Sequence, residues 1–136
     1  MQGTLKQGLV IAAMALGAHG ARAATTCTPS TDGTGAPHVV CTTTSVGGKT
    51  LTADFPGAQV THDTRTVVLC PAPASPVKLA QLWMPEMGHG SAETTLTAQG
   101  AGCTLVDNVQ FTMTGLWQIR VRFGDSDRAL VEVTIP

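Results

Sequence analysis

The sequence is poor in charged and aromatic residues. Of its 136 residues, 12% are charged, 4% are aromatic and none is tyrosine. The 8 basic and 9 acidic residues are nearly balanced, and the basic residues form no run. Because nucleic-acid binding requires a basic patch or stripe, the composition argues against a nucleic-acid partner.

The sequence also lacks the common catalytic motifs. It contains no Gly-x-Ser-x-Gly elbow, no phosphate-binding or dinucleotide-binding glycine pattern, and no His-Glu-x-x-His helix. No pair of carboxylates lies in an evidently apolar setting. We therefore predict that the protein is not an enzyme.

No apolar run is long enough to anchor the chain permanently in a membrane. The one candidate, residues 9–18, follows Lys6 and precedes the small-residue pattern Ala21-Arg22-Ala23. A basic residue, a short apolar stretch and small residues before the cut are typical of a secretory signal peptide. We predict cleavage after Ala23, a periplasmic or secreted protein, and no membrane span after cleavage.

The four cysteines lack the close spacing of zinc knuckles and of thioredoxin-like motifs. They all follow the predicted cleavage site: Cys27, Cys41, Cys70 and Cys103. An even number of cysteines in an exported chain predicts two disulfides. Three pairings are possible; we favour Cys27 with Cys41 and Cys70 with Cys103, although sequence does not decide between them.

Residues 24–136 are enough for one domain with a modest core. Residues 24–37 are rich in Thr, Ser, Gly and Pro without an apolar period, which predicts a flexible N-terminal arm. Residues 38–136 read as short Thr- and Val-rich segments separated by turn residues. The predicted strands are 38–44, 49–55, 66–70, 77–84, 93–98, 109–113, 116–123 and 129–135.

The C-terminal segments alternate most regularly. In 116–123, apolar residues at odd positions oppose Gln118, Arg120 and Arg122, and 129–135 repeats the pattern after a turn. The two segments therefore predict an antiparallel hairpin. Seven to eight such strands predict an immunoglobulin-like antiparallel β-sandwich, with Trp117 at the place of the tyrosine corner.

Soft metal ligands gather in the glycine-rich segment 83–90. It contains Met84, Met87 and His89 within six residues, and Met113 lies near the predicted corner. Thioether sulfur is uncharged and binds Cu(I) well and hard cations poorly, so this cluster indicates copper. The indole of Trp83 or Trp117 is a candidate cover for such an ion.

Two stretches, 84–90 and 111–121, resemble the YtkA-like domain, a relative of FixH-type periplasmic domains. The residues that carry the resemblance are Met84-Pro85-x-Met87-Gly88-His89-Gly90 and Phe111-x-Met113-x-Gly115-x-Trp117-x-Ile119-x-Val121. It covers residues 66–136 and departs from the family at the polar Cys103-Thr104. The resemblance implies an exported immunoglobulin-like sandwich that handles copper or other metals, and implies Met84, Met87, His89 and Met113 as ligand positions.

Each of these residues also has a structural interpretation. Met113 shares the odd-numbered phase of the core residues, and both tryptophans suit a small core. In the segment 83–90, Met84 and Met87 would cap the core, and His89 would bond a backbone carbonyl. Glu86 would either be solvated or accept a hydrogen bond from the imidazole. His38 and His62 are expected to be solvated.

The function expected from the sequence is an exported copper-binding module that captures or transfers Cu(I) or Cu(II). Its partners would be the copper ion and another exported or membrane metal-handling protein. The alternative is a non-catalytic accessory domain that uses the same Met- and Trp-bearing loop for protein contact, because methionine surfaces adapt to many partners.

Overall fold

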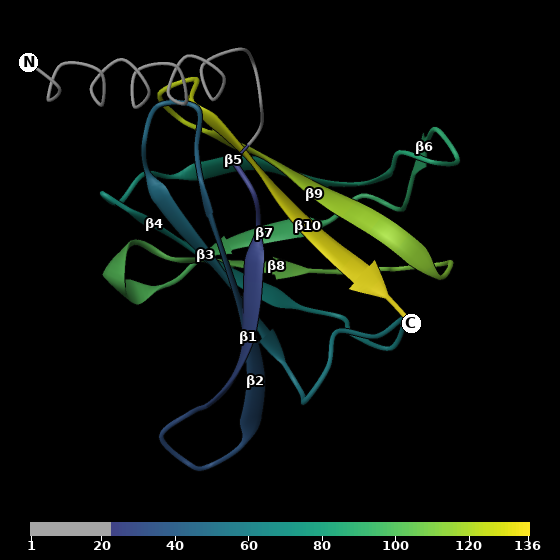
Figure 1. Ribbon diagram of the computed structural model, residues 1–136. Coiled ribbons are helices and arrows are strands. Elements are labelled where there is room, and N and C mark those ends of the chain that lie inside the picture. The colour runs from purple at the N-terminus through teal and green to yellow at the C-terminus, as the bar shows by residue number, and fades with distance from the viewer. Residues whose placement is uncertain (1–22) are drawn as a thin grey trace, which may run out of the picture.

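The structure, a computed structural model, describes residues 23–136 as two antiparallel β-sheets packed face to face (Figure 1). One sheet has the strand order β1-β2-β3-β4-β8-β7 and the other β10-β9-β5-β6. The predicted all-β sandwich is confirmed, and it has more strands than expected. The predicted signal peptide falls, apart from Ala23, outside the described residues.

The strands have two to nine residues, and every connection between them except residues 91–94 contains Gly, Pro, Asn or Asp. Their bounds are β1 Thr26–Thr31, β2 Pro37–Thr44, β3 Thr50–Pro56, β4 Val67–Ala72, β5 Val77–Met84, β6 His89–Gly90, β7 Thr95–Ala98, β8 Thr104–Asp107, β9 Gly115–Phe123 and β10 Arg128–Ile135.

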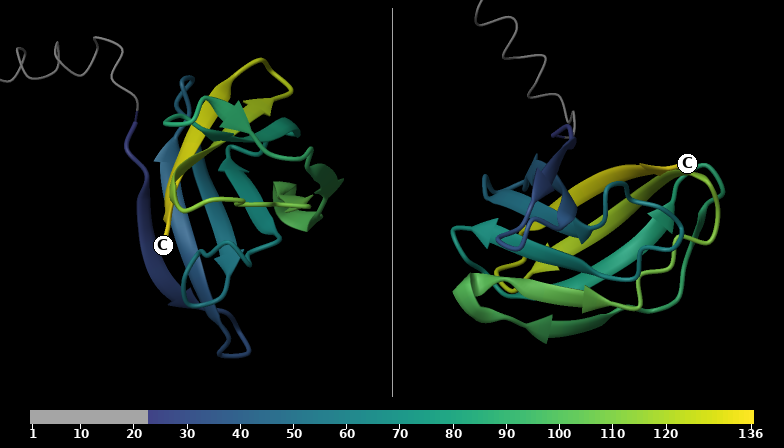
Figure 2. Two further views of the ribbon diagram at one scale, coloured as in Figure 1. Left: turned by 90° about the vertical axis from the view of Figure 1, so that its right-hand side faces the viewer. Right: turned by 90° about the horizontal axis from the view of Figure 1, so that it is seen from below.

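Strands β3 to β10 have the immunoglobulin connectivity. The order β3-β4-β8-β7 corresponds to strands A-B-E-D of a constant-type domain, and β10-β9-β5 corresponds to G-F-C. Strand β6 extends the second sheet beside β5, and β1 and β2 extend the first. Figure 2 shows the two layers from two further sides.

The β9–β10 hairpin has the predicted register and faces. Trp117 is paired with Val133, and the odd-numbered residues of both strands are buried between the sheets. Gln118 lies on the opposite face as expected, but it is only 4% exposed. Its Nε2 donates a hydrogen bond to Glu132 Oε2 over 3.1 Å, which satisfies the buried amide.

Both favoured disulfides are confirmed. Cys27 and Cys41 are directly paired across β1 and β2, and Cys70 of β4 bonds Cys103 just before β8. No free cysteine remains among residues 23–136. Two formed disulfides fit an extracellular location.

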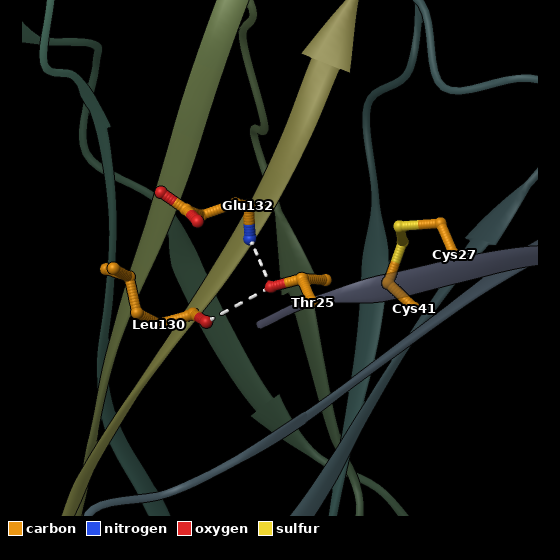
Figure 3. The surroundings of a disulfide bond; sticks show 5 residues. All are labelled: Thr25, Cys27, Cys41, Leu130 and Glu132. Atoms are coloured by element: carbon orange, nitrogen blue, oxygen red, sulfur yellow. Dashed lines mark hydrogen bonds between the residues drawn. A yellow bond between two sulfur atoms is a disulfide. The ribbon is translucent and has the colours of Figure 1, made fainter. Parts of the chain in front are cut away.

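The segment expected to be a loose arm instead contains β1. All six residues of β1 are exposed, yet they pair with β2 in continuous register. Thr25 holds the start of this segment, because its Oγ1 accepts the Glu132 N–H and donates to the Leu130 carbonyl (Figure 3). The segment is rich in threonine, which favours strands, and an exposed edge strand needs no apolar period to form.

One other strand prediction was wrong, and two further strands were not predicted. Residues 109–113 form no strand; Val109 and Phe111 are buried in an irregular segment that begins with Asn108 at a φ of 62°. The strands that were not predicted are the two-residue β6 and the four-residue β8, and in β8 Thr104 and Val106 point inward. No helix within residues 23–136 is long and apolar enough to cross a membrane.

Candidate metal site

The turn between β5 and β6 places Met84 opposite His89. The two residues are Cα partners in the β5–β6 pair, and the backbone N–H groups of Met87 and Gly88 both donate to the Met84 carbonyl. Gly88 has a φ of 66°, which closes this turn. Because directly opposed residues project to the same face of a sheet, Met84 and His89 share the inward face.

His89 is half-buried and has a defined tautomer. Its Nδ1 lies 2.9 Å from the Gly90 carbonyl oxygen, which only accepts, so Nδ1 carries the proton. Neutral His89 therefore presents an unprotonated Nε2. Its ring meets the ring of Trp117 edge-on, with the two centroids 6.3 Å apart. The bond to a backbone carbonyl is the one that the structural interpretation of His89 predicted. It takes the acceptor role that was considered for Glu86, which is exposed.

Trp117 connects this histidine to Met113. The indole is fully buried, and its Nε1 donates to the Met113 carbonyl oxygen over 2.8 Å. This bond to a carbonyl four residues upstream resembles that of a tyrosine corner, the place that the sequence suggested for Trp117, although the bond itself was not predicted. It holds the backbone of Met113 beside the start of β9.

Met113 is not the core residue that its odd position suggested. Its side chain is 41% exposed, because the chain does not enter β9 until Gly115, whose φ of 121° interrupts the alternation. Met84, in contrast, is buried at 3% exposure. Its Cε would lie 2.8 Å from a Cβ at position 115, so Met84 reaches the same segment.

Met87 lies in the turn itself and is 54% exposed. The structure therefore brings Met84, His89 and the Met113 backbone to one end of the sandwich, around Trp117, and leaves Met87 at the surface beside them. No group of three or more His, Cys, Asp or Glu side chains within residues 23–136 is arranged to hold a metal ion. Any metal bound at this end would thus depend on thioether sulfur.

Trp83 does not belong to the core or to this cluster. It points to the outer face of its sheet, where the guanidinium carbon of Arg120 lies 4.4 Å from the ring centroid. Trp83 is therefore excluded as a cover for an ion beside Met84. A β-bulge between Val77 and Leu79 changes the phase of β5, which alternation along the sequence does not reveal.

His38, expected to be solvated, lies between two carboxylates. Its Nδ1 is 2.6 Å from Asp54 Oδ1, and its Nε2 is 3.2 Å from Asp32 Oδ2. The hydrogen bond with Asp54, above all, raises the pKa of His38 over its ordinary value of 6.5. His62 is 62% exposed, with its Nδ1 3.3 Å from Asp63, in agreement with a solvated ring.

A second polar cluster joins the β2–β3 and β9–β10 turns, and no pattern along the chain predicted it. Ser45 Oγ donates to Asp127 over 2.6 Å, while Lys49 Nζ bonds both Asp127 and Asp125. A pocket of about 490 Å³ lies beside these groups. Burial raises the pKa of Asp127, but hydrogen bonds from Ser45, Lys49 and backbone amides outweigh it and lower the net pKa. Asp127 is the shared acceptor of these bonds, which join the two turns.

Comparisons with known proteins give no family assignment: no protein-family model matches the chain, and no curated protein or solved structure matches it either.

Proposed function

We propose that the protein is an exported copper-binding module that captures or transfers copper at the Met84–His89 end of the sandwich. The observation that carries the proposal is the pairing of Met84 with His89, whose Nδ1 is held by a backbone carbonyl. Histidines that bind metals commonly donate their other ring N–H in this way, which fixes the ring and leaves Nε2 for the ion.

The ligand chemistry favours Cu(I). Thioether sulfur is soft and uncharged, so a site made of methionine and one neutral imidazole adds no negative charge to attract hard divalent cations. Cysteine thiolates do not compete within residues 23–136, because all four cysteines there form disulfides. Methionine is then the soft ligand that this domain offers.

The other two methionines would complete the site from outside. Met87 and Met113 are both exposed, whereas His89 is half-buried. Exposed ligands take up an ion from solution or from a partner, whereas the buried Met84 would hold it against Gly115. A site open on one side suits capture and transfer and does not require turnover of a substrate.

The direct test is an anaerobic Cu(I) competition titration against a chromophoric chelator. We expect one Cu(I) per chain in the protein produced by secretion. The double variant Met84→Leu, His89→Asn should bind at least about tenfold more weakly, because each substitution removes one donor atom. Leucine keeps the apolar volume of methionine, so the variant should remain folded. His62→Asn, which changes an exposed histidine elsewhere, is the matched control.

Absence of Cu(I) binding, or equal affinity of the double variant, would refute the copper site. The exposed thioethers of Met87 and Met113 would then support the second candidate, an accessory domain that uses this loop for protein contact. Under that function, Met87→Ser would weaken association with a partner and leave metal affinity unchanged.

A further inference from the structure

The outer face of the four-stranded sheet gathers most of the arginines of the domain. Two rows of directly paired residues cross strands β5, β9 and β10 on this face. They are Leu79–Arg122–Arg128 and Gln81–Arg120–Leu130, which we call the arginine face. Five of the six side chains are exposed, and Leu130 is half-buried.

The next row of the same face, Trp83–Gln118–Glu132, carries one carboxylate, which accepts a hydrogen bond from Gln118. Within residues 23–136, Arg120, Arg122 and Arg128 form no ion pair. Arg122 and Arg128 are directly opposed, at a Cα separation of about 5 Å, and like charges in that position destabilise a sheet. The folded domain thus carries a local electrostatic cost that a bound anion would relieve.

This concentration contrasts with the rest of the domain. After residue 23 the chain has 9 acidic residues, and three of its four arginines lie on this one face. The sequence contains no basic run, because Arg120 and Arg122 alternate with core residues on β9 and Arg128 faces Arg122 from β10. The folding of the strands therefore gathers these positive charges on one face.

The composition of the face fits a protein partner. Interfaces between proteins are enriched in Trp and Arg and depleted in Lys and Glu. The arginine face has three arginines and two leucines, and it continues into Trp83, whose ring contacts Arg120. Trp and Arg are also the residue types most often responsible for binding energy.

Two other anionic partners, an acidic polysaccharide and an anionic membrane, fit less well. A polysaccharide would stack a sugar ring on an aromatic face, whereas one face of Trp83 is already covered by Arg120 at 4.4 Å. An anionic membrane gives about 1 kcal/mol per basic residue, so three arginines would supply about 3 kcal/mol, weaker than a millimolar complex.

We propose that the arginine face is a docking surface for a second exported protein that presents a cluster of carboxylates. The contact is electrostatic and small, so the complex should form quickly, dissociate readily and weaken with salt. The face lies on the side of the sheet opposite Met84 and His89, and the proposal does not depend on copper.

The test uses NMR of the isotope-labelled protein, with a short synthetic peptide of alternating Glu and Ala as the probe. Shift changes should concentrate at the amides of Arg120, Arg122 and Arg128 and at the Trp83 indole. The double variant Arg122→Gln, Arg128→Gln should bind the peptide at least about tenfold more weakly. Arg65→Gln, outside the face, should bind like the unmodified protein.

Several outcomes would overturn the proposal. These are shift changes centred elsewhere, equal binding of a Gln–Ala peptide, or tighter binding of phosphatidylglycerol vesicles or alginate to the same face. Self-association that covers the face would assign it to a second copy instead. Urea unfolding distinguishes a docking role of the arginines from a role in stabilising the fold. If they serve docking, the double variant should unfold at the same or a higher urea concentration. A loss of stability would show that the arginines support the fold.

Discussion

A Cβ at Gly115 would lie 2.8 Å from Cε of Met84. The residue that opens β9 therefore leaves the space into which the buried thioether of β5 extends. This contact joins the sandwich core to the candidate metal site, because Gly115 is two residues after Met113 and two before Trp117. The glycine is also required by its backbone, which has a φ of 121°.

Gly115→Ala should therefore destabilise the protein and disturb Met84. The strained backbone alone costs about 1–3 kcal/mol, measurable by urea unfolding. Gly48→Ala is the matched control, since Gly48 has a φ of 97° but a Cβ added there would meet nothing within 4 Å. A larger loss at Gly115, with weaker Cu(I) binding only in that variant, would report the Met84 contact. Equal losses in both variants would argue against it.

Sequence was sufficient for the features that depend on local periodicity. The odd-numbered core residues of β9, its hairpin with β10 and the Trp117 corner all follow from alternation and turn residues. The disulfide pairing was favoured but not determined, because spacing alone leaves three arrangements.

Sequence failed where a bulge or an edge strand changed the pattern. The bulge in β5 turned Trp83 outward, and Gly115 removed Met113 from the core phase. Strand β1 was not predicted, because an exposed edge strand needs no alternation of apolar and polar residues. His38 bonds Asp54, which is 16 residues away along the chain. The three arginines lie close together in the sequence, but only the pairing of β5, β9 and β10 shows that they share one exposed face.

Thr25→Val should release the start of the N-terminal strand from β10. The Thr25 hydroxyl accepts the Glu132 N–H at 2.9 Å and donates to the Leu130 carbonyl, and valine keeps the shape without these bonds. We expect a loss of about 0.5–1.5 kcal/mol and faster hydrogen exchange at the Glu132 amide. Thr28→Val, on exposed β1, is the control. Unchanged exchange at Glu132 in Thr25→Val would contradict this role.

His38 should make stability depend on pH. Its pKa is raised in the folded protein, chiefly by the hydrogen bond to Asp54, so its stabilisation is complete below the ordinary value of 6.5. The stabilisation is lost as the pH rises through the raised folded pKa. Asp32, with its pKa lowered to about 2 by hydrogen bonds from Thr34, stays ionised throughout this range.

The measurement is the free energy of unfolding in urea at a series of pH values from 6 upward. It should fall as the pH increases, and Asp54→Asn should reduce the slope because the main cause of the pKa shift is removed. NMR titration of the His38 ring should show the same change directly. A free energy that is independent of pH in this range, or an unchanged His38 pKa in Asp54→Asn, would contradict the prediction.

The two disulfides should stabilise different parts of the protein. In the chain-entropy account, closing loops with sequence separations of 14 and 33 residues contributes about 3 and about 4 kcal/mol respectively. The Cys27–Cys41 bond, however, holds a strand whose six residues are all exposed. Without it, β1 can leave β2 while the core stays folded, so part of the loss appears as local opening.

Hydrogen exchange distinguishes the two cases. Replacement of Cys27 and Cys41 by Ala should accelerate exchange in β1 and at the Glu132 amide, with slow exchange retained in the β9–β10 hairpin. Replacement of Cys70 and Cys103 by Ala should instead accelerate exchange across both sheets, because this bond ties β4 of the core to the segment before β8. If β1 stayed as protected as β9 in the first variant, the β1–β2 ladder alone would hold the strand, and the disulfide would be dispensable for its attachment.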